Sequence, residues 1–496
     1  MKTTIWILLA ATLLAALVSV DSARAQAPGR GRVYIILWFI TDDSHLAQGD
    51  TAAKRLAAYL TQQGVRATFL VSAEKARALE RRNRQDVIGA LAQHEIGYYS
   101  ERLGQGELDA NADAGKNLEE WVRSERADLD DVRRVLGQSP ACYGGAEAVL
   151  SPALYAALQK WGMKVYFHRG QWSAANEKPF WHEGLLNIST SRETQQLRPD
   201  SGWSNLAEAR ARFQDFHFRV SSHREGTLLN VCFGPAEFVQ QANPAKEEVA
   251  QTSGGHDPTD SPAVKSPEES EKAFSYFESL VTYLKSSSGV EFVTASTALG
   301  MLRDTAQRRV YSRVELGNVA KFVEPAVVFQ NHEDYILTPG EVFFLLAKSV
   351  AGVIRRQTYE PILLDGTPFG PASPPPEAGP STVEVSWEQF ASAAREVADY
   401  ASKENRVPEA VRVGNATVSP ASFLVALAQV TQILQLKGEP PESVQFGAAH
   451  LNVGDYLEGE SSGPGGEPAK GQGPAQKGPA KLEAWTFKPA RFQTQH

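Results

Sequence analysis

Two adjacent carboxylates, Asp42 and Asp43, directly follow a continuous apolar run from Val33 to Thr41. A run of this length and composition predicts a strand that is buried on both faces, as in parallel sheets. Active sites of parallel α/β and barrel folds gather at the carboxyl ends of the strands. Two adjacent carboxylates at this place could share the roles of general base and metal ligand. The alternative is an ordinary turn, because Asp and Ser are common where a strand ends.

Strands and helices alternate along the residues that follow. This alternation predicts an α/β fold with a parallel sheet or a barrel. The pattern loosens after His168 and resumes near Gly226. We expect strands at 67–71, 95–99, 141–143, 163–167, 226–233 and 290–294, and helices at 52–63, 117–136, 151–161 and 269–285, with a further helix ending near 91.

Four short segments carry a resemblance to a known family. They are Ile40 to Ser44, Gly64 to Val71, His94 to Gly97, and Phe233 to Phe238. Their sequences and their order resemble those of NodB-type polysaccharide deacetylases. The first corresponds to the family's T-F-D-D-G signature, of which only the two aspartates match. The resemblance covers residues 32–305 and implies a distorted (β/α) barrel.

The resemblance also implies a chemistry. Members of this family hydrolyse an acetamido group on a sugar with the help of a divalent metal, which polarises the carbonyl and activates water. Asp42 would then be the base, and Asp43 would be a metal ligand. The substrate or partner class implied is a polysaccharide or cell-wall glycan.

The chain departs from the family at most of the remaining ligand positions. Tyr99 and Leu103 stand where the family has the two histidines of its H-x-x-x-H segment. Gly234 stands where the family has, late in the domain, the His that acts as the catalytic acid. One carboxylate cannot hold a catalytic metal tightly, because such sites supply three protein ligands. We therefore expect no cofactor, and a zinc-type divalent metal only if other side chains rebuild the site. The candidates for such rebuilding are His45, His168, His182 and His223, whereas His94 is expected to make a structural hydrogen bond.

Tyr99 and Tyr143 lie at predicted strand ends and offer another kind of site. Sugars stack their apolar faces on aromatic rings beside a few polar groups. An inactive barrel could keep such a groove, with Tyr99 and Tyr143 as binding residues. The alternative, given equal weight, is that both rings belong to the core.

The region after residue 305 predicts a small, mostly helical domain over residues 330–450. Thr338-Pro339 and Ser419-Pro420 each precede an apolar helical pattern, as capping residues do. The segment from Asn405 to Gly414 is similar to the pseudomurein-binding repeat, a module that attaches exported proteins to wall polymer. Residues 457–481 are rich in Gly and Pro and predict a disordered linker. The short apolar stretch 485–490 is expected to dock back on a domain.

The N-terminus and the composition set the outer limits. Lys2, an apolar run to Val20 and Ala23-Arg24-Ala25 predict a cleaved signal peptide over residues 1–25, hence an exported protein without a membrane anchor after cleavage. The formal net charge of -8 argues against a nucleic-acid partner. Export permits a disulfide between Cys142 and Cys232, although two buried thiols are the preferred interpretation.

Three hypotheses about function result. The first is an exported carbohydrate- or cell-envelope-binding protein that is non-catalytic or weakly catalytic. The second is an active metal-dependent polysaccharide deacetylase with a rebuilt site. The third is a structural or protein-interaction scaffold, for which the charged helix expected at 117–136 would provide a surface. Whether the chain is an enzyme is thus left open by the sequence.

Overall fold

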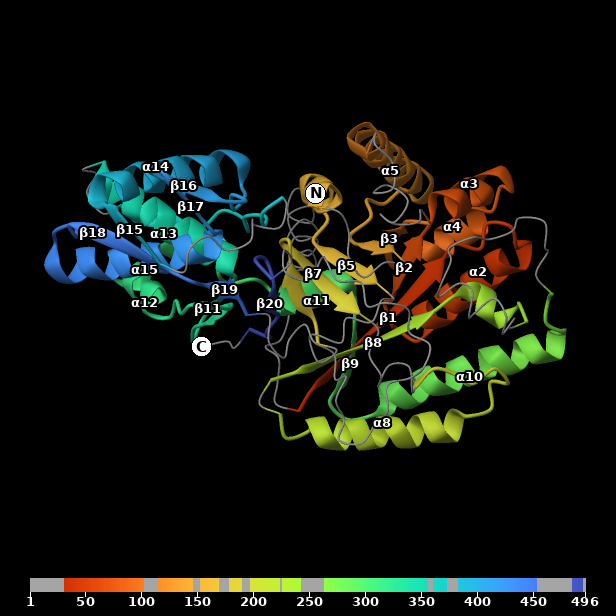
Figure 1. Ribbon diagram of the computed structural model, residues 1–496. Coiled ribbons are helices and arrows are strands. Elements are labelled where there is room, and N and C mark those ends of the chain that lie inside the picture. Colours follow the sequence, from red (N-terminus) through yellow and green to blue (C-terminus); the bar gives the residue numbers. More distant parts are fainter. Residues whose placement is uncertain are drawn as a thin grey trace, which may run out of the picture.

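The computed structural model describes residues 31–101, 114–145, 152–168, 178–189, 197–223, 225–241, 263–355, 360–372, 382–452 and 484–493. These residues form an α/β part and a smaller, mostly helical part that lie side by side (Figure 1). The expected signal peptide at 1–25 and the expected linker at 457–481 lie outside the described residues. None of the helices in the described ranges is long and apolar enough to span a bilayer.

The α/β part is built on a ten-stranded, mostly parallel sheet with the order β20-β6-β7-β5-β4-β3-β2-β1-β8, and β9 also pairs with β1. β1 is parallel to its neighbours β2, β8 and β9, and only the β6–β7 and β20–β6 pairs are antiparallel. The strands are β1 (Val33–Thr41), β2 (Thr68–Val71), β3 (Glu95–Tyr99), β4 (Tyr143–Gly145), β5 (Val165–His168), β6 (Phe180–His182), β7 (Leu185–Ser189), β8 (Thr227–Phe233), β9 (Val290–Val293) and β20 (Lys488–Pro489).

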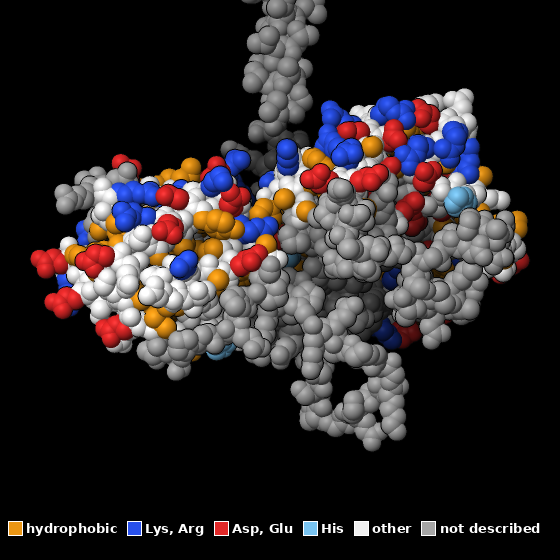
Figure 2. Space-filling view, turned by 45° about the horizontal axis from the view of Figure 1, so that its top comes forward, with side chains coloured by type: hydrophobic (Ala, Val, Ile, Leu, Met, Phe, Trp, Pro, Cys, Tyr) orange, Lys and Arg blue, Asp and Glu red, His pale blue; other side chains and the backbone are white. Residues whose placement is uncertain are grey.

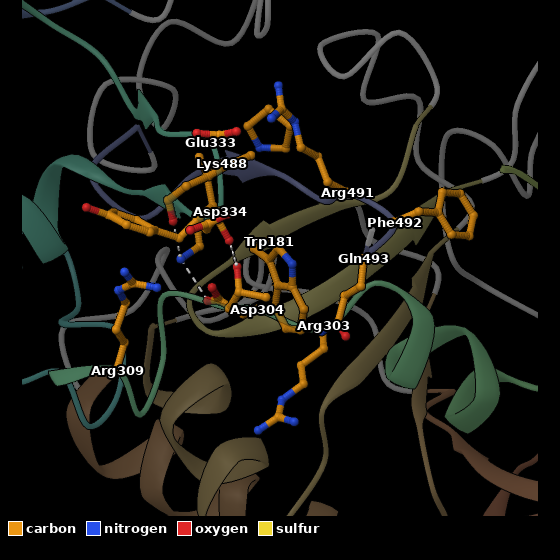
Figure 3. Close-up of a pocket in the computed structure, with 14 residues that line it drawn as sticks. Trp181, Arg303, Asp304, Arg309, Glu333, Asp334, Lys488, Arg491, Phe492 and Gln493 are labelled. Atoms are coloured by element: carbon orange, nitrogen blue, oxygen red, sulfur yellow. Dashed lines mark hydrogen bonds and ion pairs between the residues drawn. The ribbon is translucent and has the colours of Figure 1, made fainter. Parts of the chain in front are cut away.

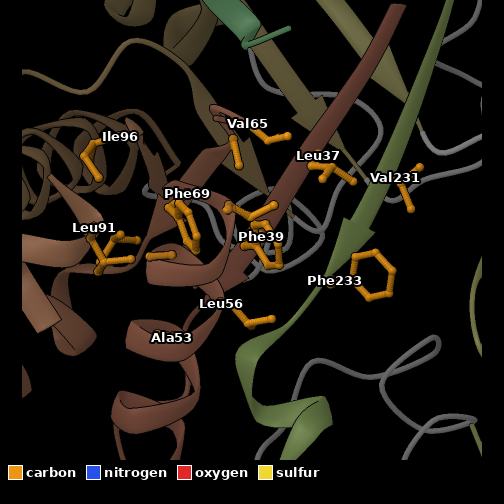
Figure 4. Close-up of a cluster of buried hydrophobic side chains, with 14 of the residues drawn as sticks. Leu37, Phe39, Ala53, Leu56, Val65, Phe69, Leu91, Ile96, Val231 and Phe233 are labelled. Atoms are coloured by element: carbon orange, nitrogen blue, oxygen red, sulfur yellow. The ribbon is translucent and has the colours of Figure 1, made fainter. Parts of the chain in front are cut away.

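Alternate residues of the central strand separate an outer from an inner core. Odd-numbered residues of β1, such as Leu37 and Phe39, pack outward against the helices in the cluster drawn in Figure 4. Even-numbered residues, such as Trp38, face the concave side and join a second cluster. The helices of this part are α2 (Ala47–Gln62), α3 (Ala73–Arg81), α4 (Gln85–Leu91), α5 (Ala114–Leu136), α6 (Pro152–Lys160), α8 (Leu206–Val220), α10 (Pro267–Ser286) and α11 (Ala295–Met301), with a 3-10 turn η3 (Pro235–Phe238).

Side chains close the gap between β7 and β8. Trp38 Nε1 donates to Asn230 Oδ1 at 3.1 Å, and Asn230 Nδ2 donates to the carbonyl of Ser189 at 2.7 Å. Asn230 lies on the edge strand β8 and Ser189 on β7, so one buried amide links two strands that are far apart in the order of the curled sheet. The predicted α/β fold with a distorted (β/α) barrel is confirmed.

The smaller part contains four capped helices, α12 (Arg313–Lys321), α13 (Pro339–Ile354), α14 (Trp387–Glu404) and α15 (Pro420–Lys437). Thr338 and Ser419 accept hydrogen bonds from the first turns of α13 and α15, which confirms the caps expected there. Their common hydrophobic cluster begins at Ala306, upstream of the boundary at 330. Short strands join them: β10 (Val310–Tyr311), β11 (Ala326–Val327), β12 (Gln330–Asn331), β13 (Ile336–Leu337), β14 (Ile362–Leu363), β15 (Thr382–Ser386), β16 (Val411–Val413), β17 (Ala416–Val418), β18 (Ser443–Gly447) and β19 (His450–Leu451).

The C-terminal segment 484–493 binds both parts, as expected for its apolar stretch. Trp485 packs in the helical cluster and accepts a hydrogen bond from the amide of Gly340. Three residues on, β20 pairs with β6 at the edge of the large sheet. Lys488 Nζ lies 2.7 Å from Asp304 Oδ2 and 2.8 Å from Glu341 Oε2, and all three side chains are largely buried. Lys488 and Asp304 line a cavity of about 340 Å³ between the two parts. Figure 3 shows both side chains among the residues that line it.

Candidate functional site

The carboxyl ends of β1 and its neighbours meet at one end of the curled sheet, which we call the barrel mouth. The amide of Ser72, which follows β2, donates to the carbonyl of Thr41 at 3.1 Å, and the amide of Ser100, after β3, donates to Gly144 at 2.9 Å. The two aspartates leave β1 at this end, as expected. They differ sharply in environment, because Asp42 is exposed whereas the side chain of Asp43 is only 7% exposed.

Asp43 is held by a lysine that lies on the next helix. Lys75 Nζ lies 2.8 Å from Asp43 Oδ1 and donates to the main-chain carbonyl of Asp43 at 3.1 Å. The Lys75 side chain is fully buried. Asp43 Oδ2 has no hydrogen-bond partner and lies against Gly49, where an added Cβ would be 1.4 Å from it. The carboxylate is therefore enclosed by protein rather than presented at the mouth.

A second carboxylate, Asp50, completes the surroundings of the ammonium. Asp50 Oδ1 lies 2.7 Å from Lys75 Nζ, and both side chains are fully buried. Behind it, Arg82 donates to Asp50 Oδ2 at 3.1 Å and to the carbonyl of Ser44 at 2.8 Å. Arg84 lies 3.7 Å from the same Asp50 oxygen. The two buried carboxylates are thus compensated by Lys75 and Arg82 and in part by Arg84, which also pairs with the exposed Asp86 at 2.9 Å.

The local sequence explains why Lys75 points inward. Ser72 caps α3 and accepts a hydrogen bond from the amide of Lys75 at 3.2 Å. Lys75 therefore lies in the first turn, on the same face as Ala76, Ala78 and Leu79, which are all buried. Burial of this face against the sheet brings the ammonium to the carboxyl end of β1.

Burial shifts the pKa of two carboxyl groups at the mouth. Loss of hydration raises the pKa of Asp43 to about 6, an effect that Lys75 opposes and that Asp42 and Asp50 reinforce. Loss of hydration also raises the pKa of Glu101 to about 7; a hydrogen bond with Ser72 opposes this rise, and the charge of Asp42 adds to it. Glu101 follows β3; the residue as a whole is exposed at the rim, but its carboxyl group is partly buried, so a carboxyl with a pKa near neutral lies near Asp42.

The described residues do not fit a metal ion of the kind that the family resemblance implies. No group of three or more His, Cys, Asp or Glu side chains in the described ranges could hold one. Lys75 occupies the position beside Asp43 that a metal would need. His45 is exposed next to the aspartates, and His223 hydrogen-bonds to Gly31 just before β1, at the opposite end of the barrel. Leu103 lies outside the described residues.

Of the remaining histidines, His168 lies at the carboxyl end of a parallel strand and thus on the mouth side of the sheet, whereas His182 lies at the opposite end and His94 has structural surroundings. His182 pairs with Leu185 at the start of β7, away from the mouth, and its Nδ1 lies 3.1 Å from Thr486 Oγ1 in the C-terminal segment. His168 ends β5. His94 Nδ1 accepts a hydrogen bond from the amide of Ala67, and His94 Nε2 lies 2.9 Å from the carbonyl oxygen of Ala57. The structural hydrogen bond predicted for His94 is confirmed.

Both tyrosines considered as sugar-stacking residues are buried. Tyr99 is 6% exposed and packs inside the barrel, and Tyr143 is 1% exposed and packs on the outer side. The hydroxyl of Tyr143 donates to Glu125 on α5 at 2.8 Å, and burial raises its pKa well above the usual value. Tyr143 therefore presents no ring face to solvent, and these placements correspond to the core interpretation. Cys142 and Cys232 are both buried and free, as preferred from the sequence.

The charged helix α5 turns much of its charge toward a neighbouring helix. Arg77 on α3 lies 3.0 Å from Asp128 and 2.7 Å from Asp131, and Arg134 pairs with Glu80. Figure 2 shows side chains of both signs intermingled over this region at the upper right. The surface considered for protein interaction is thus partly neutralised within the chain.

Three residues of the mouth were missed by sequence reasoning: Lys75, Asp50 and Glu101. Lys75 and Asp50 stand at positions with the helical spacing of buried neighbours, and a charge at such a position is the signal that could have revealed them. Glu101 lies two residues after the strand 95–99, so its place near a strand end was visible in the sequence.

Comparisons with known proteins give structural similarity only. No protein-family model matches the chain, and no curated protein does. Among solved structures, the chain is similar to a protein from Mycobacterium smegmatis assigned as a polysaccharide deacetylase, with 14% identity and a TM-score of 0.36 over 55% of this chain and 92% of that one. It is similar to another protein so assigned from Pseudomonas aeruginosa PAO1, with 12% identity and a TM-score of 0.36 over 57% and 97%.

A third similar structure is a CE4 family pseudoenzyme from Bacillus anthracis, with 10% identity and a TM-score of 0.29 over 54% of this chain and 65% of that one. Identities this low concern the fold alone. The architecture given above therefore rests on the strand order and register of this chain.

Proposed function

We propose that this chain is an exported carbohydrate- or cell-envelope-binding protein that uses a deacetylase-like barrel without metal-dependent catalysis. The observation that carries the proposal is the ion pair between Lys75 Nζ and Asp43 Oδ1 at 2.8 Å. A metal-dependent deacetylase needs this carboxylate as a ligand, and here a buried ammonium holds it. Asp43 then has a structural role in place of a catalytic one.

The exposed groups at the mouth support a binding role. Asp42 and Glu101 are exposed at the ends of β1 and β3. An ionised carboxylate accepts hydrogen bonds from sugar hydroxyls, and a protonated one also donates. With its pKa raised to about 7, Glu101 supplies both states near neutral pH. These contacts require no metal, so binding should be insensitive to chelators.

The helical part supplies a second reason to consider wall polymers. Its segment from Asn405 to Gly414 resembles the pseudomurein-binding repeat, and the structure has helix α14, the hairpin β16–β17 and helix α15 in that order. The arrangement corresponds to the helix, loop and helix from which the resemblance was drawn. Attachment of the chain to envelope polymer through this part is our proposal.

The test combines binding, acetate release and metal content in the purified mature chain. Chitin beads and purified bacterial sacculi serve as probes, each with and without EDTA, and elemental mass spectrometry follows soaking in zinc, cobalt or manganese. We expect retention that survives EDTA, no acetate release and no stoichiometric metal. Acetate release that EDTA abolishes would instead establish an active deacetylase, and absence of retention on both probes would favour a scaffold.

A matched pair of variants locates the binding surface. Asp42→Asn removes the exposed charge at the mouth, whereas Glu225→Gln removes an exposed charge just before β8, at the opposite end of the barrel. We expect Asp42→Asn to weaken retention and Glu225→Gln to leave it unchanged. Equal retention of both variants would show that the mouth does not take part in binding.

A further inference from the structure

The cavity between the two parts has an unused hydrogen-bond donor in its wall. Trp181 lines this cavity of about 340 Å³ and lies opposite Lys488 in the pairing of β6 with β20. Trp181 is 7% exposed and also packs in the inner cluster of the barrel. Its Nε1 makes no hydrogen bond to any described residue, and it is not among the unpartnered atoms that the protein encloses. A buried indole N–H usually has a partner, so this donor is available to a ligand in the cavity.

Hydrogen bonds within the chain fix the walls of the cavity. The hydroxyl of Thr305, which follows α11, donates to the carbonyl of Asp334 at 2.6 Å, and the amide of Gln493 donates to the carbonyl of Met301 at 3.0 Å. Figure 3 shows Trp181 and Gln493 among the lining residues. The cavity is therefore present in the native chain, as small-molecule sites usually are. Its volume is at the small end of the range of about 300–1,000 Å³ for such sites, which suits a ligand of one or two rings.

Two of the cations that line the cavity are already paired. Lys488 Nζ lies 2.7 Å from Asp304 Oδ2 and 2.8 Å from Glu341 Oε2. Arg309 lies 2.7 Å from Glu315 Oε1. These five groups comprise two cations and three carboxylates, so they leave no positive charge to attract an anionic ligand.

The other charged groups of the lining are exposed and balance one another. Arg303 and Arg491 make no ion pair within the described residues. Glu333 and Asp334, in the loop before β13, contribute two carboxylates. The lining thus offers both donors and acceptors and has no net positive charge. A ligand whose groups donate as well as accept suits such a lining, and hydroxyl groups do both.

We propose that this cavity binds an uncharged saccharide of one or two residues. The indole N–H of Trp181, the Gln493 amide and the Arg491 guanidinium donate to the sugar oxygens, and the Glu333 carboxylate accepts from the sugar hydroxyls. Apolar surface of Trp181 and Phe492 lies against the C–H groups of the ring. Aromatic rings beside a few polar groups are the usual composition of such sites.

The cavity is separate from the barrel mouth. Trp181 pairs with Leu186 near the start of β7, at the end of the sheet opposite the mouth. The choice of a saccharide rests on the proposed function, whereas the site itself includes no residue of the mouth. The two sites can therefore be tested independently of each other.

The experiment is calorimetric titration of the mature full-length protein with cellobiose and with N,N′-diacetylchitobiose, two uncharged disaccharides. Trp181→Phe keeps an aromatic ring and removes the N–H, and Arg491→Gln removes an exposed guanidinium. Arg81→Gln is the matched control, because Arg81 is an exposed arginine at the end of α3 that does not line the cavity. We expect wild type to bind at millimolar concentration, each cavity variant to bind roughly twofold to tenfold more weakly through loss of one hydrogen bond, and Arg81→Gln to bind as wild type does.

Several results would overturn the inference. They are absence of disaccharide binding to wild type, equal affinity of wild type and both cavity variants, and tighter binding of sodium glucuronate than of the uncharged sugars. If Trp181→Phe does not fold, Arg491→Gln and Gln493→Ala, both in the C-terminal segment, decide in the same way.

Asp42→Asn and polymer retention separate this inference from the proposed function. Disaccharide binding that Asp42→Asn abolishes and the cavity variants leave intact would overturn the inference and support the proposed function at the mouth. Loss of disaccharide binding in the cavity variants, with no retention of wild type on chitin beads or sacculi, would support the cavity site for free saccharides and count against the proposed polymer binding. Weaker retention of the cavity variants on these polymers would instead show that the saccharide belongs to a polymer chain.

Discussion

Replacing Lys488 by Met should test how strongly the C-terminal segment joins the two parts of the molecule. The Lys488 ammonium donates to Glu341 Oε1 at 2.9 Å, to Glu341 Oε2 at 2.8 Å and to the carbonyl of Ile336 at 3.1 Å, and it pairs with Asp304 at 2.7 Å. Glu341 is fully buried. The variant therefore leaves a buried carboxylate without its counter-ion.

The size of the stability loss depends on the hydrogen bonds that Glu341 retains in the variant. Loss of one partner of a buried pair costs about 3–5 kcal/mol, because the remaining charge stays in a poorly hydrated place. Glu341 still accepts hydrogen bonds from Gln307, from the hydroxyl of Thr367 and from the amide of Thr338. These donors are neutral and soften the loss, so we expect a fall of about 3 kcal/mol in the free energy of unfolding.

The pH dependence of this loss has a definite sign. Burial raises the pKa of Glu341, with Lys488 opposing and Asp304 adding to the rise. A carboxyl with a raised native pKa is destabilising when ionised, and protonation removes that penalty as the pH falls toward its ordinary value of 4.5. The cost of Lys488→Met should therefore be largest near neutral pH and smaller in mildly acidic buffer.

The assay is urea-induced unfolding at both pH values, with hydrogen exchange of the β6 and β20 amides to report on the docked segment. The double variant Lys488→Met, Glu341→Gln is the control, since it removes the charges of Lys488 and Glu341 and keeps the shape, while Asp304 still loses its ion pair. We expect it to recover the part of the loss that comes from Glu341. The reasoning would be refuted if Lys488→Met cost less than about 1 kcal/mol, or if the double variant were no more stable than the single one.

Three further predictions concern the barrel. Gly49→Ala should lower the free energy of unfolding by about 1–3 kcal/mol, since the new Cβ would lie 1.4 Å from Asp43 Oδ2. At Gly89 in α4 an added Cβ meets no atom within 4 Å, so Gly89→Ala should raise the free energy of unfolding by up to about 1 kcal/mol. Equal effects of the two variants in urea unfolding would contradict the packing at Gly49. Burial lowers the pKa of His94, so below pH 6.5 the unfolded chain binds more protons than the native one, and the free energy of unfolding should decrease as the pH is lowered from 6.5. His94→Asn should remove this part of the pH dependence, and a variant with an unchanged pH profile would argue against it. Cys142 and Cys232 should resist iodoacetamide until the chain unfolds, because both are buried and burial raises the pKa of Cys142 well above 9.0; rapid labelling of the native chain, followed by mass spectrometry, would disprove this.

Much of the fold could be predicted from local patterns, since each predicted element depends mainly on its own residues. The apolar run from Val33 to Thr41 became the central strand, and the Pro-containing caps at Thr338 and Ser419 begin α13 and α15. The strand expected at 141–143 is observed at Tyr143–Gly145, and α2 begins at Ala47 rather than at 52. Boundaries of this kind depend on pairing partners as well as on local sequence.

Features that depend on distant partners could not be predicted. Lys75 is one of many lysines, and only the crossing of α3 over the end of β1 makes it the counter-ion of Asp43. Tyr143 faces outward because of its register with Tyr98 and Tyr166, which sequence spacing alone does not determine. The β6–β7 hairpin was missed: Glu183 and Gly184 both have positive φ, but Glu-Gly is not one of the usual two-residue turn signals, which are Asn-Gly, Asp-Gly and Gly-Gly.

The pairing of β20 with β6 also bears on how the chain folds and aggregates. The strands are separated by some 300 residues, so the edge of β6 stays unpaired while the rest of the sheet forms. An open edge displays free amides and carbonyls that recruit other strands. Chains cut before Trp485 should therefore self-associate through β6 even when their barrels are intact, and late docking of the final strand would be the step at which chaperones or low temperature improve the yield of monomer.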